Sequence, residues 1–259
     1  MSASSELRAA VAFLTPLGRK GPEPSPLTMA YFPLVGAALG GLVGLSWRQA
    51  RRSFSPLLSA ALAVAADSAF TGALHLDGLA DTADGLFAHT PAQARLDIMS
   101  EPRVGSFAAV AIGLSLATRL AALASFEPSP ALLSALYCSS RSVMVIGSRW
   151  LPYARREGLA SAFLPSAGAP DPALLSAVVG AAAALVLASV VAGRRGAAAV
   201  ATGWVTAALL LESARRRLGG FTGDVLGAAG VTFETAGLVV AARIGRAPGS
   251  AVAWNGAAR

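Results

Sequence analysis

Residues 173–193 read "ALLSAVVGAAAALVLASVVAG", a run without a single charged side chain. About 18 or more consecutive apolar residues are enough to cross a bilayer as an α-helix, and several comparable runs occur along this 259-residue chain. We therefore predict an all-α, polytopic integral membrane protein, a helical bundle with about seven spans. The predicted spans are residues 29–47, 56–74, 104–126, 131–151, 173–193, 197–211 and 225–244.

The composition supports a membrane protein. Hydrophobic residues make up 54% of the chain and charged residues 14%, whereas about a quarter of a soluble domain is charged. The net charge of +7 lies in short clusters between the apolar runs, as anionic lipid headgroups favour. No long basic tract is present, so we expect a lipid bilayer as partner and no nucleic acid. The length fits one transmembrane domain, 1–259, with residues 1–27 as an N-terminal interfacial segment.

The order of the spans predicts which loops lie together. The loops after the second, fourth and sixth spans share one face of the membrane, and the distribution of basic residues weakly favours the cytoplasmic side for it. The sixth span is short and can pair with the fifth as a tight hairpin. These three loops carry nearly all of the unusual polar side chains.

The stretch "HLDGLADTADG", residues 75–85, concentrates negative charge directly after an apolar run. Asp77, Asp81 and Asp84 are spaced i, i+4 and i+7, which places them on one face of an α-helix. Carboxylates this close need cations, and Mg²⁺ typically joins a few carboxylates to substrate phosphates. The alternative is an exposed helix start with favourable acids near its N-terminus. His75 lies off the aspartate face, as a ligand or as an interfacial histidine.

The loops of this face also supply candidate anion-binding groups. Arg103 in "IMSEPRVGSF" and Arg155 in "PYARREGLASAF" suit contact with phosphate, or simply follow the positive-inside rule. In "GGFTGDVLGA", Thr222, Gly223 and Asp224 stand at the start of the last span, where free N–H groups can meet a phosphate. Asp224 is a candidate for a fourth metal-binding carboxylate.

Arg119, Arg141 and Glu234 lie inside predicted spans. Arg141 and Glu234 are costly there, so each needs a partner or a polar cavity. Arg119 is a residue of the same kind, unless its side chain reaches an interface instead.

In this order and within this apolar frame, "HLDGLADTADG", "IMSEPRVGSF", "YARREGL" and "GGFTGDVLGA" resemble cobalamin synthase, the adenosylcobinamide-GDP ribazoletransferase family of the vitamin B12 pathway. The resemblance implies a multi-pass enzyme of the bacterial inner membrane that needs Mg²⁺. It joins adenosylcobinamide-GDP to α-ribazole, or to its 5′-phosphate, and releases GMP. The implied metal ligands are Asp77, Asp81, Asp84 and Asp224. The implied catalytic residues are Asp84, as the base, Asp81 and Arg103. The implied substrate-binding residues are His75, Arg103, Arg141, Arg155, Thr222, Gly223 and Glu234.

Two other functions stay open at this point. A CDP-alcohol phosphotransferase also builds a metal site from spaced aspartates at the membrane face, and a small-solute transporter would use intramembrane charges to line a path. The preference between α-ribazole and its phosphate is also open. Spans rich in small residues permit a homo-oligomer without specifying one.

Overall fold

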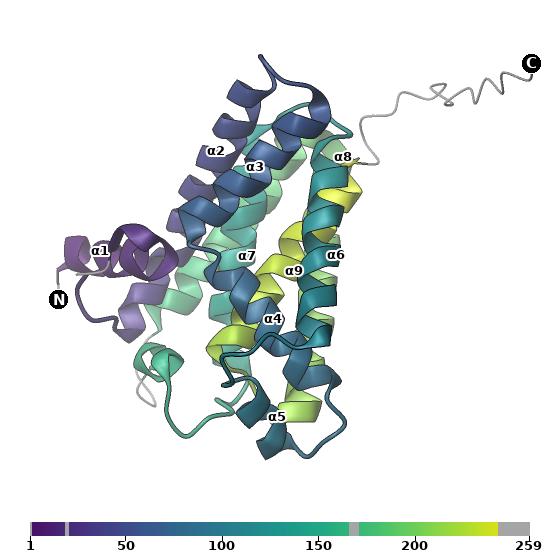
Figure 1. The fold of residues 1–259 in the computed structure, drawn as a ribbon. Coiled ribbons are helices and arrows are strands. Elements are labelled where there is room, and N and C mark those ends of the chain that lie inside the picture. The colour runs from purple at the N-terminus through teal and green to yellow at the C-terminus, as the bar shows by residue number, and fades with distance from the viewer. Residues whose placement is uncertain (1, 19–20, 166–170, 243–259) are drawn as a thin grey trace, which may run out of the picture.

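The computed structural model describes residues 2–18, 21–165 and 171–242, and these form an elongated helical bundle (Figure 1). The α-helices are α1 (Ala3–Leu14), α2 (Phe32–Ala50), α3 (Pro56–Thr71), α4 (Leu74–Phe87), α5 (Ala92–Ile98), α6 (Ser106–Leu123), α7 (Pro130–Trp150), α8 (Pro172–Leu218) and α9 (Gly223–Ala242). Short 3₁₀ turns cover η1 (Pro16–Gly18), η2 (Pro26–Tyr31) and η3 (Leu159–Phe163). The all-α prediction is confirmed.

The N-terminal segment is tied to the bundle by a buried acid. Glu6 of α1 is 2% exposed, and its carboxylate accepts hydrogen bonds from the hydroxyls of Ser25 (3.0 Å) and Thr28 (2.6 Å). Because both hydroxyls belong to the start of η2, α1 is held beside the entrance to α2.

The second predicted span, 56–74, ends earlier than expected. Gly72 and Ala73 have positive φ angles of 61° and 57°, which end α3 at Thr71 and turn the chain by 90° into α4. A left-handed backbone suits glycine but is uncommon for alanine. The acidic stretch therefore forms a separate helix with its own direction.

The fifth and sixth predicted spans are the two halves of α8. At Gly193 the backbone (φ 61°, ψ −150°) is not helical, and this combination is essentially restricted to glycine. A Cβ added to Gly196 would collide with the carbonyl oxygen of Ala188, although a straight helix would separate these residues by about 12 Å. The chain therefore reverses at Gly193, and the predicted hairpin is confirmed.

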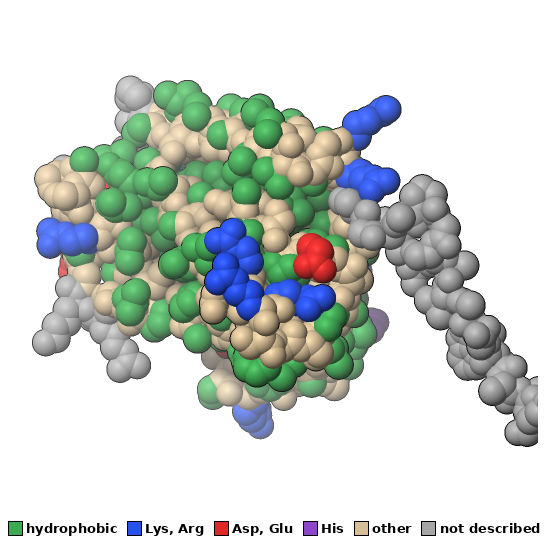
Figure 2. All heavy atoms as spheres, turned by 90° about the horizontal axis from the view of Figure 1, so that it is seen from above, with side chains coloured by type: hydrophobic (Ala, Val, Ile, Leu, Met, Phe, Trp, Pro, Cys, Tyr) green, Lys and Arg blue, Asp and Glu red, His purple; other side chains and the backbone are tan. Residues whose placement is uncertain are grey.

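The outer surface fits a bilayer. Within the described ranges, five helical segments are long and apolar enough to cross a membrane when α8 is counted once, and α3 qualifies only together with α4. Large apolar side chains are exposed on α6 and α8, including Leu114, Val190 and Leu209. At the end where α2 joins α3, basic side chains gather beside an acidic one (Figure 2), and Arg51 there pairs with Glu127 at 3.5 Å.

The loops at the opposite end converge, as the order of spans predicted. The Phe221 N–H donates to the carbonyl of Pro152 (2.9 Å), and the Ala154 N–H donates to the carbonyl of Phe221 (2.9 Å). Arg217, at the end of α8, donates to the carbonyl of Leu86 at the end of α4 (2.7 Å). These bonds hold the loops after α4, α7 and α8 at the start of α9.

Candidate active site

The three aspartates of the acidic stretch lie on α4, so the predicted helix is confirmed. α4 packs against the first turns of α9 at two points. A Cβ on Gly78 would lie 2.8 Å from the carbonyl oxygen of Asp224, and one on Gly227 would lie 3.4 Å from the Cα of His75. Only a residue without a side chain allows so close an approach at Gly78. The two acidic segments thus meet at one end of the bundle.

This contact gathers negative charge. Asp81 is half-buried, and partial burial together with the charges of Asp224 and Asp77 raises its pKa to about 6. The positive charge of Arg155 lowers the pKa of Asp81. The excess of carboxylates over cations is the condition under which a bound cation becomes favourable.

The start of α9 fixes Asp224. The Thr222 hydroxyl accepts the N–H of Val225 (3.2 Å), which caps the helix, and donates to the Asp224 carboxylate (3.2 Å). Arg155 donates to the same carboxylate oxygen at 3.2 Å. Arg155, Thr222, Gly223 and Asp224, predicted from two separate loops, are therefore brought together. The Arg155 Nε is buried, and residues 2–18, 21–165 and 171–242 supply no hydrogen-bond partner for it.

Asp84 faces the neighbouring helix. Its two carboxylate oxygens accept the backbone N–H groups of Gly105 (2.7 Å) and Ala108 (2.9 Å) at the N-terminus of α6. A carboxylate at this position satisfies unpaired helix donors and complements the helix dipole. Asp84 therefore positions α6 against α4, a contact that the spacing of the aspartates did not reveal.

Arg103 lies on the surface between α5 and α6. Its side chain is 84% exposed and pairs with Glu101 at 2.9 Å. It shares a shallow surface pocket with Asp84. It does not line the cavity that contains Asp77 and Asp224.

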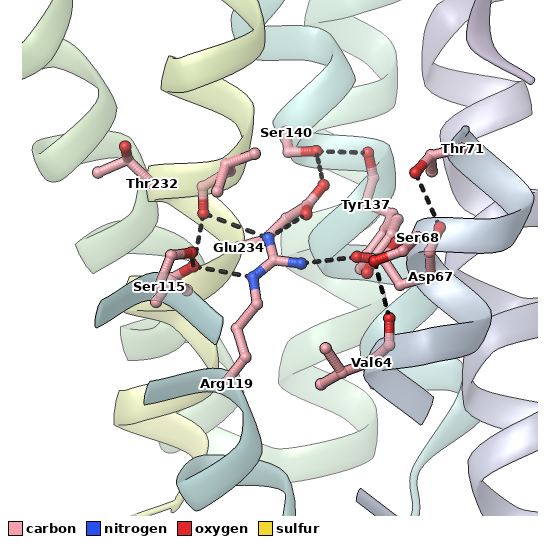
Figure 3. Close-up of polar contacts among 12 residues, drawn as sticks. Val64, Asp67, Ser68, Thr71, Ser115, Arg119, Tyr137, Ser140, Thr232 and Glu234 are labelled. Atoms are coloured by element: carbon pink, nitrogen blue, oxygen red, sulfur yellow. Dashed lines mark hydrogen bonds and ion pairs between the residues drawn. The ribbon is translucent and has the colours of Figure 1, made fainter. Parts of the chain in front are cut away.

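Glu234 belongs to a buried ionic network with Arg119 and Asp67 (Figure 3). Arg141 joins this network through Glu234. The Glu234 carboxylate accepts from Arg141 (2.7 Å) and from Arg119 (2.6 Å), and Arg119 also donates to Asp67 (2.8 Å). The four side chains come from α7, α9, α6 and α3. Two arginines and two carboxylates balance each other, so the expectation that the intramembrane charges need partners is confirmed.

Asp67 is the member of this network that the sequence reading missed. It is an acid within the apolar run "SAALAVAADSAF", and its residue is 8% exposed. Like Glu234, Asp67 is a charged residue inside a predicted span, and this feature of the sequence already indicates that it needs a partner.

His75 lines a cavity of about 360 Å³ beside the acidic cluster. Asp77, Arg155 and Asp224 contribute to the same cavity. His75 is 5% exposed, and neither of its ring nitrogens has a hydrogen-bond partner among the described residues. The cavity therefore joins an apolar chamber to a charged rim.

Within the described residues, no group of three or more His, Cys, Asp or Glu side chains could hold a metal ion by itself. Mg²⁺ usually needs only one or two protein carboxylates, because waters and substrate phosphates complete its octahedral coordination. Asp77, Asp81 and Asp224 offer the hard oxygen donors that it prefers, with unbalanced charge. These residues fit an ion whose coordination a phosphorylated substrate completes.

Comparison with known proteins identifies relatives along nearly the whole chain. The profile of the family described as cobalamin-5-phosphate synthase matches residues 6–242. The adenosylcobinamide-GDP ribazoletransferase of Syntrophobacter fumaroxidans is 38% identical over 92% of this chain and 98% of that protein. Those of Bradyrhizobium diazoefficiens and Sinorhizobium medicae are 36% and 39% identical, over 92% and 70% of this chain and 93% and 72% of their own lengths. No solved structure matches.

Proposed function

The chain belongs to the cobalamin-5-phosphate synthase family, and on that premise we propose that it is an adenosylcobinamide-GDP ribazoletransferase. In the proposed reaction, a ribose hydroxyl of α-ribazole or of its 5′-phosphate attacks the phosphoryl group that the corrinoid carries. A bond forms between the ribose oxygen and phosphorus, the bond from phosphorus to GMP breaks, and GMP leaves.

One observation carries this proposal. The carboxylates of Asp77, Asp81 and Asp224 come from two separate segments and act on one another at the end of the bundle, beside Arg155. Phosphoryl transfer depends mostly on positioning and on neutralising charge, which this arrangement supplies once a divalent cation is present.

Asp77, Asp81 and Asp224 would hold Mg²⁺, which when bound neutralises the diphosphate and polarises the transferring phosphoryl group. Arg155, with a buried Nε that lacks a partner, is placed to contact a phosphate oxygen. We assign the attacking hydroxyl's proton to Asp81 rather than to Asp84, which was the expectation from sequence. Both oxygens of Asp84 already accept backbone N–H groups, whereas Asp81 lies among the carboxylates of Asp77 and Asp224.

The remaining predicted residues take supporting places in this proposal. Thr222 orients Asp224, and Gly223 leaves the start of α9 open to a phosphate. Arg103, exposed beside α6, stays a prediction for contact with the departing GMP. Arg141 and Glu234 hold the helices behind the site in register, and their direct contact with substrate stays a prediction. We place the reaction at the cytoplasmic edge of a bacterial inner membrane.

The test is turnover by purified protein in lipid, with Mg²⁺, adenosylcobinamide-GDP and α-ribazole, scored for GMP and for the completed corrinoid. Asp77→Asn and Asp224→Asn should each lower turnover by about a hundredfold or more, because each removes charge from the metal site. Asp97→Asn, at an exposed acid on α5, is the matched control and should retain turnover. Near-normal GMP release by Asp224→Asn, or transfer to a CDP-alcohol in place of GMP release, would reject the proposal.

A further inference from the structure

The cavity beside the acidic cluster is mostly apolar. Its inner wall includes Phe13 of α1, Phe32 of α2 and Phe163 of η3. These rings pack on one another, with centroids 5.7 Å apart for Phe13 and Phe32 and 4.8 Å for Phe13 and Phe163. Across the cavity wall, Tyr153 packs against Phe221 at 5.3 Å. Aromatic walls of this kind suit a flat, uncharged ring system.

His75 is the polar exception in this chamber. Both of its ring nitrogens are buried without a partner in the part of the chain that the structure describes, and a buried polar group left unpaired carries a desolvation cost. A neutral imidazole can donate through one nitrogen and accept through the other. Its placement on the cavity wall indicates that a ligand supplies the missing partner.

We propose that this cavity holds the nucleoside acceptor: its aromatic base lies among the phenylalanines, one of its polar atoms bonds to His75, and its ribose points to the charged rim of Asp77, Arg155 and Asp224, with which Asp81 interacts. This inference rests on the proposed function. The volume of about 360 Å³ lies at the lower end of the range for ligand pockets, so it fits a nucleoside and excludes a corrinoid ring. The corrinoid must then approach from the open side of the rim.

The position of the rim supports this orientation. Asp77, Arg155 and Asp224 all border the cavity at its charged end, and Asp81 interacts with them. A base buried in the chamber would thus present its sugar to the carboxylates and not to the lipid. A lipid acyl chain would fill the apolar part of the chamber but would leave the His75 nitrogens unpaired.

The test compares His75→Leu with His75→Gln in lipid nanodiscs. Loss of the hydrogen bond in His75→Leu should raise the KM for α-ribazole by about three- to tenfold, with the KM for adenosylcobinamide-GDP unchanged. His75→Gln keeps a donor and an acceptor and should recover most of that loss. Ala160→Leu, which adds bulk to the cavity wall, should raise the KM for α-ribazole and leave the KM for adenosylcobinamide-GDP unchanged.

A binding measurement separates this inference from the proposed function. With a chelator and no corrinoid, α-ribazole should raise the melting temperature of the wild type in a saturable way, and His75→Leu should require about three- to tenfold more α-ribazole. Wild-type turnover with an unchanged KM for α-ribazole in both His75→Leu and Ala160→Leu would overturn the inference alone. Displacement of the nucleoside's effect by added phospholipid, with no effect of either substitution, would assign the cavity to lipid. Failure of the wild type to release GMP would reject the proposed function itself.

Discussion

Replacing Asp81 by asparagine should stabilise the protein while abolishing its activity. Asp81 is half-buried among other carboxylates, and its pKa rises from 3.8 to about 6. Since one pKa unit corresponds to about 1.4 kcal/mol, the ionised side chain costs the folded state about 3 kcal/mol before screening. The side chain is partly solvated, so screening reduces this cost to about 1 kcal/mol. Asparagine keeps the shape of the side chain and removes the charge.

The assay is thermal unfolding in detergent micelles at pH 7.5 with a chelator present. For a chain of this size, 1 kcal/mol corresponds to an increase of about 2–4 °C in Tm. Above pH 6 the carboxylate is ionised in both the folded and the unfolded state, so the folded state bears the full cost. Below pH 4 both states are protonated, and the advantage of Asp81→Asn should vanish.

Asp97→Asn provides the control, because Asp97 is exposed on α5 and bonds only to Gln93 among the described side chains (3.0 Å). It should leave Tm unchanged at both pH values. If Asp81→Asn lowered Tm at pH 7.5, or raised it equally at pH 4 and pH 7.5, the idea of mutually repelling carboxylates would be wrong.

Three further results are expected. Glu234→Gln should lower the free energy of unfolding by about 3–5 kcal/mol, because it leaves Arg141 without its buried carboxylate and Arg119 with Asp67 alone. Glu127→Gln, at an exposed ion pair, should change the free energy of unfolding by less than about 0.5 kcal/mol, and chemical unfolding of the two variants checks this. Asp84→Ala should lower the free energy of unfolding by about 1 kcal/mol, because it removes the cap of α6, whereas Asp81→Asn should raise it. An unchanged or raised Tm of Asp84→Ala would contradict the assigned contact. Addition of Mg²⁺ should raise the Tm of the wild type in a saturable way, and equal stabilisation of the wild type and the Asp77→Asn variant would argue against a metal site there.

The sequence was sufficient for the fold class and for the meeting of the acidic segments. Apolar runs gave the spans, and counting them placed the loops after α4, α7 and α8 at one end, where Phe221 pairs with Pro152. The period of the aspartates correctly predicted α4. The hairpin within α8 also followed from the length of the sixth run, with Gly193 as its turn.

What the sequence could not give was the direction of individual side chains. Asp84 has the same spacing as its neighbours, yet it caps α6, because the chain between α4 and α6 folds back through α5. The charged partner of Arg141 is Glu234 on α9, far away in the chain, so the sequence indicated only that a partner was needed. Likewise, the cavity around His75 is assembled from α1, α2, α4, α7, α9 and two loops, which no local pattern describes.

The most direct measurement is a double-mutant cycle on Mg²⁺ affinity, using protein in nanodiscs with adenosylcobinamide-GDP bound. If the carboxylates of α4 and α9 grip one ion, Asp77→Asn and Asp224→Asn should each raise the Kd for Mg²⁺, and the double variant should lose less than the sum of the two effects in free energy. Fully additive effects, or a Kd that neither substitution changes, would show that the two segments do not share a cation.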